Sequence, residues 1–131
     1  MKKTGILNRD VSALVAETGH YDRIVIGDAG LPIPPGVPCI DLTVGKNDPT
    51  IEDVLKMLAL ELPVEQFWIA TEYPSVDSRI KQIQDIFPGS KAITVAHDEF
   101  KKLNHDAMCV IRTGDFSPYS NVMLACGVAF N

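Results

Sequence analysis

Two side chains that could exchange protons with a substrate flank a short apolar run near the start of the chain: His20 precedes it and Asp28 follows it. Histidine can act as a general acid or base near neutral pH. Asp28 stands between Gly27 and Gly30, where small neighbours let a polar ligand approach the backbone. Both residues also have structural explanations, since a histidine past a helix end can bind the last carbonyl groups and an aspartate can form a turn. The functional interpretation is acid–base chemistry on a polar ligand.

Further polar residues follow later apolar runs. His97 stands at an expected helix start, where it is either a surface residue or a second contact to the same ligand. Segment 115–121 ends in Tyr119, Ser120 and Asn121. A tyrosine can stack on the face of a sugar and donate its hydroxyl, while an asparagine amide can pair with a vicinal diol. This segment is therefore either a plain turn-rich loop or a sugar-binding loop.

The composition narrows the class of protein. The 131 residues carry a net charge of −5, and an acidic surface disfavours nucleic acid and anionic membranes as partners. The glycine patterns of nucleotide-binding loops and C-x-x-C pairs are absent, and a zinc site would have to be assembled in space from distant histidines. No apolar stretch is long enough to cross a membrane, no secretory signal is recognisable, and three separated cysteines fit reduced thiols. We expect a cytoplasmic enzyme that needs neither metal nor nucleotide.

Short apolar runs alternate with segments of helical period, which predicts an α/β fold in one domain, residues 1–131. The expected helices cover residues 10–17, 51–62, 76–87 and 98–103. The expected strands cover residues 23–27, 39–42, 66–71, 91–95, 107–112 and 122–130. Because helices join most of the strands, we expect a three-layer α/β/α arrangement around a mainly parallel six-stranded sheet, a variant of the Rossmann type.

Several residues carry helix-end signals. Asp10 and Ser75 are candidate N-caps, and Gly19 suits the left-handed position that ends a helix. Thr50 followed by Asp53 resembles a capping box, with aspartate in place of the usual glutamate. These signals predict where three of the helices begin and where the first one ends.

Polar residues also follow the expected strands. Asp28, Glu72, His97 and Thr113 come after four of them. Open α/β sheets bind ligands beyond the carboxyl ends of their parallel strands. We therefore expect Asp28 and His97 to lie at the same edge of the sheet.

Four blocks of the sequence resemble the D-ribose pyranase family: residues 5–8, 17–22, 26–34 and 111–121. The resemblance runs nearly end to end and in order, while residues 44–93 contribute little to it. The family interconverts the pyranose and furanose ring forms of D-ribose, without a cofactor. The resemblance implies that His20 is the catalytic proton donor. It also implies ribose contacts from Asp28, His97, Tyr119, Ser120 and Asn121, with Ser120 contributing its backbone rather than its side chain.

Ring interconversion passes through the open aldehyde and needs a proton on the ring oxygen and the loss of one from the anomeric hydroxyl. One positioned acid–base group typically supplies about 10² to 10⁴-fold. Asp28, His97 and water are the candidates for the base. The nearest alternative is a mutarotase for another sugar such as L-fucose, although residues 30–34 favour ribose. A second alternative is a non-catalytic sugar-binding accessory of ribose transport, which would not need an ionisable His20.

The expected strand 23–27 separates His20 from Asp28. At about 3.3 Å per residue, eight extended residues would place them as much as roughly 25 Å apart in one subunit. If both belong to one site, the simplest arrangement takes His20 from a neighbouring subunit. We therefore predict an active site at a subunit interface. The resemblance separately implies a large ring-shaped homo-oligomer, a decamer.

Overall fold

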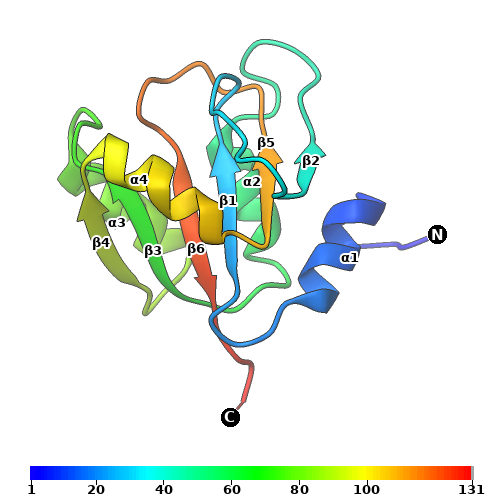
Figure 1. Cartoon of the computed structure of the whole chain (residues 1–131). Helices are drawn as coiled ribbons and strands as arrows, with labels where there is room; N and C mark the ends of the chain where they lie inside the picture. Colours follow the sequence, from blue (N-terminus) through cyan, green and yellow to red (C-terminus); the bar gives the residue numbers. More distant parts are fainter. Residues whose placement is uncertain (131) are drawn as a thin grey trace.

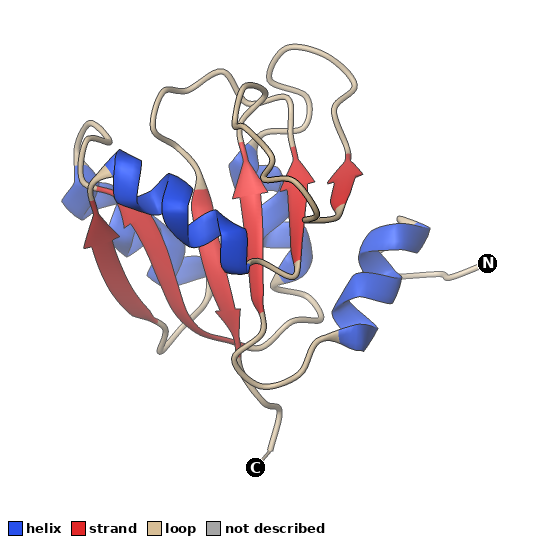
Figure 2. Cartoon of the chain, viewed as in Figure 1, coloured by secondary structure: helices blue, strands red, loops and turns tan. Residues whose placement is uncertain are grey.

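Six strands form one sheet in the computed structural model, which describes residues 1–130 (Figures 1 and 2). Their order across the sheet is β2-β5-β1-β6-β3-β4. Five strands point the same way, and β6 is antiparallel to both of its neighbours, β1 and β3. The strands are β1 (Arg23–Gly27), β2 (Cys39–Asp41), β3 (Val64–Ala70), β4 (Lys91–Val95), β5 (Cys109–Arg112) and β6 (Val122–Cys126). This arrangement confirms the mainly parallel six-stranded sheet.

Helices cover both faces of the sheet, which confirms the three-layer prediction. Figure 1 shows α4 in front of the sheet and α2 and α3 behind it. Helix α1 lies beside the edge strand β2, and its Val11 and Leu14 join the same hydrophobic core as α2 and α3. The helices are α1 (Arg9–Glu17), α2 (Ile51–Leu58), α3 (Val76–Ile86) and α4 (His97–Leu103), followed by a short 3₁₀ turn (Asn104–Asp106).

Alternation along the strands creates the two cores. In β1, Ile24 and Ile26 face the core under α2 and α3, whereas Val25 faces the core under α4. In β3, Phe67 belongs to the first core and Trp68 to the second. Successive side chains of a strand point to opposite faces, so a strand covered on both faces reads as a continuous apolar run. The sheet thus gives a rigid platform whose strand ends can carry functional loops.

Two predicted end signals of α1 are wrong. Asn8, not Asp10, caps the helix, because its side-chain oxygen accepts the N–H of Val11 at 2.9 Å. Asp10 lies instead in the first turn. The left-handed residue after the helix is Tyr21 (φ 70°) rather than Gly19.

The other two helix starts give one confirmation and one correction. Asp53 N–H donates to the Thr50 hydroxyl at 3.1 Å and Thr50 N–H to the Asp53 carboxylate at 3.0 Å, which confirms the capping box. Ser75 has the N-cap position of α3, but its backbone is left-handed (φ 57°) and its side chain makes no capping bond.

The final strand is shorter than predicted, since β6 ends at Cys126 and does not include Val128 or Phe130. Its partner β3 begins at Val64, and the next backbone bond, from Gly127 N–H to Pro63 O, already lies outside the ladder. The pairing of β3 with β6 therefore ends at Val64 and Cys126. Helix α2 likewise ends at Leu58 rather than at residue 62, because the chain turns over residues 59–61.

The antiparallel direction of β6 determines where its flanking loops lie. No helix crosses between β5 and β6, so β6 enters the sheet from the edge at which the parallel strands end. Segment 113–121 therefore lies at the carboxyl edge, beside the residues that follow β1 and β3 (Figure 2). The end of β6 lies at the opposite edge, near the residues that precede β1.

Candidate active site

Asp28 and Asn121 meet at the carboxyl edge of the sheet. Asp28 follows β1, and its backbone N–H donates to Oδ1 of Asn121 at 2.6 Å. Its own carboxylate accepts the N–H of Gly30 at 2.9 Å and closes a turn, the structural role that an aspartate at this position predicted. Asn121 directly precedes β6 and is 2% exposed. These contacts hold the half-buried Asp28 in place and leave part of its carboxylate available to a ligand.

His97 and Tyr119 extend this edge toward the other end of the sheet. Three strand spacings, roughly 14 Å, separate β1 from β4, so Asp28 and His97 do not touch directly. The loop before β6 bridges the gap: the Tyr119 ring packs edge-on against the His97 ring, with centroids 5.1 Å apart. The edge therefore carries a continuous series of polar side chains from β1 to β4.

Glu72 fixes the backbone of His97. Both of its carboxylate oxygens accept the His97 N–H, at 3.1 and 2.9 Å, and one accepts the Thr71 hydroxyl at 2.8 Å. The hydrogen bond from the His97 N–H is the main cause that holds the pKa of Glu72 below its ordinary value, and the bond from the Thr71 hydroxyl is the second. A negatively charged carboxylate at the start of α4 also interacts favourably with the positive end of the helix dipole.

Among the predicted site residues, two buried polar atoms lack a hydrogen-bond partner within residues 1–130. They are Nδ2 of Asn121 and Nδ1 of His97. The Asn121 amide orientation follows from its bond to Asp28, because only the oxygen can accept an N–H. Buried polar groups are normally paired, and unpaired ones often mark a place where a ligand or water completes the bonds. The arrangement therefore suits a small molecule with several hydroxyl groups.

The hydroxyl and the carbonyl of Ser120 are both hydrogen-bonded within the protein. Its hydroxyl donates to the Ser117 carbonyl at 2.7 Å and is thus occupied inside the loop. Its own carbonyl accepts a bond of 2.9 Å from Nη2 of Arg79, a residue of α3 that is 7% exposed. The guanidinium also lies over the Tyr73 ring, 5.0 Å from its centroid. Arg79 thereby ties the loop before β6 to the helix layer.

The loop after β5 is held from below by Thr113 and Asp115. The Thr113 hydroxyl donates to the Gly27 carbonyl at 2.8 Å, next to Asp28. Asp115 accepts the N–H of Ile51 at 3.0 Å and the N–H of Ser117 at 2.8 Å. A cleft of about 380 Å³ lies above these contacts, lined by residues 28–30 and 115–118.

His20 lies at the opposite end of the sheet. It occupies the turn between α1 and β1, near the end of β6, and its side chain is 39% exposed. Its Nε2 lies 2.7 Å from Oε1 of Glu65, and its ring stacks on Tyr21 with centroids 3.8 Å apart. The structure thus gathers Asp28, His97, Tyr119, Ser120 and Asn121 at one edge of the sheet and leaves His20 at the other, as the strand geometry predicted.

No sequence pattern identified three residues that make these supporting contacts: Arg79, Asp115 and Glu65. Arg79 and Glu65 fall in the stretch with little family signal, and each looks like an ordinary surface charge in a helix or strand. Asp115 stands in the predicted loop but gave no sign of its bond to α2. Only the tertiary contacts reveal these three residues.

The three cysteine thiols are poor nucleophiles in this structure. Burial raises the pKa of both the Cys109 and the Cys126 thiols to about 11, so they stay protonated and inert. Cys39 is exposed, and burial raises its pKa as well. Within residues 1–130, no group of three or more histidine, cysteine or acidic side chains could hold a metal ion. The same residues contain no helix long and apolar enough to span a bilayer.

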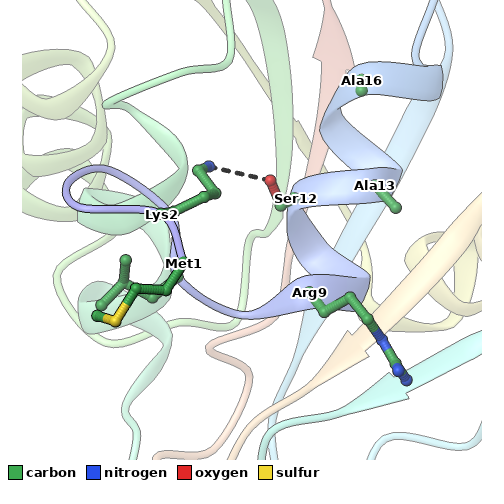
Figure 3. A pocket seen from close by; sticks show the side chains of 7 residues that line it. Met1, Lys2, Arg9, Ser12, Ala13 and Ala16 are labelled. Atoms are coloured by element: carbon green, nitrogen blue, oxygen red, sulfur yellow. Dashed lines mark hydrogen bonds between the residues drawn. The ribbon is translucent and has the colours of Figure 1, made fainter.

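A larger cleft of about 570 Å³ lies between the N-terminal segment and α1 (Figure 3). Figure 3 shows Lys2 reaching across it, where its amine donates to the Ser12 hydroxyl at 3.0 Å. The rest of the lining is mainly apolar, from Met1, Leu7, Ala13 and Ala16. None of the predicted site residues lines it, so the polar edge remains the candidate site.

Comparison with known proteins identifies similar chains over the full length. The sequence model of the RbsD / FucU transport protein family matches residues 1–129. The D-ribose pyranase of Thermosipho africanus is 45% identical over 130 residues, which cover 99% of this chain and 100% of that protein. The D-ribose pyranase of Bacillus subtilis is 44% identical over 131 residues, with the same two coverages.

Solved structures agree with these sequence matches. The structure of Bacillus subtilis RbsD complexed with D-ribose superposes with a TM-score of 0.91 at 44% identity, covering 99% of this chain and 100% of that chain. The fucose mutarotase of Streptococcus pneumoniae in complex with L-fucose gives a TM-score of 0.79 at 21% identity, with 95% of each chain covered. The second match shows a shared fold only.

Proposed function

The chain belongs to the RbsD / FucU transport protein family, and from this membership we propose that it is a D-ribose pyranase, an isomerase that interconverts the pyranose and furanose forms of D-ribose. The observation that carries the proposal is the full-length likeness to Bacillus subtilis RbsD, whose solved structure contains D-ribose. The polar edge described above supports it independently, because it offers the hydrogen-bonding groups that a pentose needs. The more distant fucose mutarotase makes L-fucose the weaker choice of substrate.

The reaction needs only proton transfers. A proton added to the ring oxygen and a proton lost from the anomeric hydroxyl open the ring to the aldehyde, and closure through a different hydroxyl gives the other ring size. His20 is the proton donor in this proposal, and Asp28, His97 or water accepts the anomeric proton. Hydride transfer, phosphate and metal have no part in these steps. One positioned acid–base group accounts for an acceleration of about 10² to 10⁴-fold.

Ribose would lie along the edge between β1 and β4. The Asp28 carboxylate accepts hydrogen bonds from sugar hydroxyls, and the unpartnered Nδ2 of Asn121 donates a hydrogen bond to another hydroxyl. His97 offers its unpartnered Nδ1, and Tyr119, which is 41% exposed, offers its ring face and hydroxyl. Ser120 contributes backbone, since its side chain is bonded within the loop.

His20 would reach this ribose from a neighbouring subunit. Within one chain the five residues of β1 alone span about 17 Å, so a single pentose cannot touch both His20 and Asp28. Contact between the carboxyl edge of one subunit and the His20 turn of the next solves this. Such a contact joins two different surfaces, and repeated contacts of this kind form a ring when the rotation between subunits closes.

Exposed apolar groups support contacts at both ends of the sheet. Tyr21 is 66% exposed next to His20, and Phe116 is 58% exposed next to the cleft. We propose a ring-shaped homo-oligomer, a decamer, in the cytoplasm. Its acidic surface, with a net charge of −5, disfavours binding to nucleic acid or anionic membranes.

Saturation transfer by NMR between the ring forms of D-ribose tests the proposal. We expect the protein to speed pyranose–furanose exchange and His20→Ala to return it to the uncatalysed rate. Faster exchange of L-fucose than of ribose would instead identify a fucose mutarotase. Ribose binding without faster exchange would identify a sugar-binding accessory of transport and would refute the enzyme.

A further inference from the structure

The Glu65 carboxylate makes the one hydrogen bond that holds the His20 ring within residues 1–130. Glu65 Oε1 lies 2.7 Å from His20 Nε2, and both side chains are 39% exposed. A carboxylate has no proton to give, so Nε2 must carry the shared proton. The contact therefore selects one tautomer of the neutral ring, and Nδ1 makes no hydrogen bond to any of these described residues.

A β-bulge presents Glu65 to His20. The register of β3 against β6 runs from Val64 opposite Cys126 to Gln66 opposite Ala125, so Glu65 is an extra residue without a partner. A bulge interrupts the ladder and re-aims the side chain of the extra residue, and bulges are enriched next to active sites. Regular pairing would have given this position a partner on β6.

Gly127 leaves room for the Glu65 side chain. A Cβ atom at Gly127 would lie 2.8 Å from Cγ of Glu65, closer than carbon atoms can approach. The residue after β6 must therefore lack a side chain if Glu65 keeps this path. Two separate features of the chain, an extra residue in β3 and a glycine after β6, serve the same contact.

The turn that carries His20 is tied to the same place. Tyr21 adopts a left-handed backbone (φ 70°), and its N–H donates to the Cys126 carbonyl at 2.9 Å. Its ring stacks on the imidazole with an interplanar angle of 18°. The backbone and the ring of Tyr21 therefore confine His20 from one side, and Glu65 confines it through Nε2.

Stability alone does not explain this arrangement. A contact between two side chains this exposed contributes little to folding, and a bulge interrupts the hydrogen-bond ladder of the sheet. The loss of regular pairing in β3 has a reason if the contact between Glu65 and His20 serves the chemistry of His20. Carboxylates that bind the far nitrogen of a functional histidine fix its tautomer and orientation in other proteins.

We propose that Glu65 is the positioning residue of the proton donor: it fixes the proton on Nε2 of His20, so that Nδ1 transfers the proton to and from ribose. This inference rests on the proposed function. In the forward step, the Nδ1 proton of the imidazolium moves to the ring oxygen, and the bond between that oxygen and the anomeric carbon breaks. The anomeric hydroxyl loses its proton to a base and becomes the carbonyl oxygen. His20 is left neutral, with Nε2 still protonated against Glu65.

The tautomer can be measured without any activity assay. Magic-angle-spinning NMR of protein labelled with ¹⁵N-histidine, in its native assembly and at alkaline pH, reports which ring nitrogen carries the proton, and His20→Ala assigns the signal. We expect a protonated Nε2 and an unprotonated Nδ1 in the native protein. Glu65→Ala should mix the two tautomers, whereas Glu65→Gln should keep the preference because its amide oxygen still accepts. A native His20 protonated on Nδ1 would overturn the proposal.

Exchange kinetics test the consequence. Glu65→Ala should lower kcat for ribose exchange about 10- to 100-fold with little change in KM, as expected for the partner of a functional histidine. Gly127→Ala should act in the same direction by displacing the Glu65 side chain. Glu52→Gln is the matched control, since Glu52 is also 39% exposed and also ion-paired, to Lys56 at 3.0 Å, and should leave kcat unchanged.

The outcomes separate the two proposals. A His20→Ala variant that keeps the native rate would refute His20 as the donor, and the role of Glu65 with it. Loss of activity in His20→Ala together with a native kcat in Glu65→Ala would refute Glu65 alone. A lowered kcat in Glu65→Ala with an unchanged His20 tautomer would also count against it, because the effect would then have another origin.

Discussion

Two inactive variants should restore each other if the active site combines residues from two subunits. His20→Ala removes the proposed proton donor but leaves Asp28. Asp28→Asn removes the charge but keeps an oxygen to accept the Gly30 N–H, so the turn after β1 is preserved. We expect each variant alone to lose most of its activity. For His20→Ala the loss is the whole contribution of one acid–base group, about 10² to 10⁴-fold.

The expected recovery follows from the geometry. A site is intact only if the subunit that supplies His20 is the Asp28→Asn chain and the subunit that supplies Asp28 is the His20→Ala chain. With random assembly and a fraction f of one variant, intact sites make up f(1 − f) of the total, a maximum of about one quarter at equal amounts. A site within a single chain would give no intact sites at any ratio.

Co-expression of the two variants at several ratios, with the composition measured by native mass spectrometry, gives f directly. Ribose exchange is then measured by saturation transfer at each ratio. Separately purified variants, mixed only just before the assay, are the control for slow subunit exchange. Activity that stays at the level of the single variants across all ratios would refute the shared site.

Three further predictions concern the polar edge and the thiols. Asn121→Asp should keep the acceptor for the N–H of Asp28 and therefore the fold. The variant loses the donor Nδ2, so its affinity for ribose, measured by calorimetry, should fall. An unchanged affinity would exclude that donor from the site. Hydrogen bonds from the His97 N–H and the Thr71 hydroxyl lower the pKa of Glu72. The contribution of Glu72 to the stability of the folded protein should therefore be complete above the ordinary pKa of 4.5 and disappear as the pH falls through the lower native pKa. Thermal unfolding against pH should show this acid loss, and Glu72→Gln should remove it. Alkylation followed by mass spectrometry at about pH 8 should label the exposed Cys39 alone, since the buried cysteines of β5 and β6 have pKa values raised to about 11, and a second adduct on the folded protein would contradict their burial.

The fold could be predicted from local patterns because both faces of the sheet are buried. Apolar runs then mark the strands, and helical period marks the segments between them. Errors occurred where the deciding contact is not local. The end of β6 depends on where β3 begins, and the left-handed residue after α1 is Tyr21 because its N–H binds the end of β6.

The polar edge was predicted in part. Asp28 and His97 follow strands, and the rule for parallel sheets places such residues together. The pairing of Asp28 with Asn121 could not be predicted, because it requires β6 to run antiparallel beside β1. The supporting roles of Arg79 and Asp115 were equally invisible, since a charged residue in a helix or loop gives no sign of its distant partner.

The sequence by itself determined the class of protein and its family, and it predicted the site residues, because side-chain types and family motifs are local properties of the chain. It also determined that His20 and Asp28 stand at opposite ends of one strand, because the rise of a strand is fixed by backbone geometry. The tertiary structure decided which groups meet at each end. A reversed β6 brings Asn121 to Asp28, and a bulge in β3 brings Glu65 to His20. Both contacts join segments far apart in the chain, and only the order and register of the strands bring those segments together.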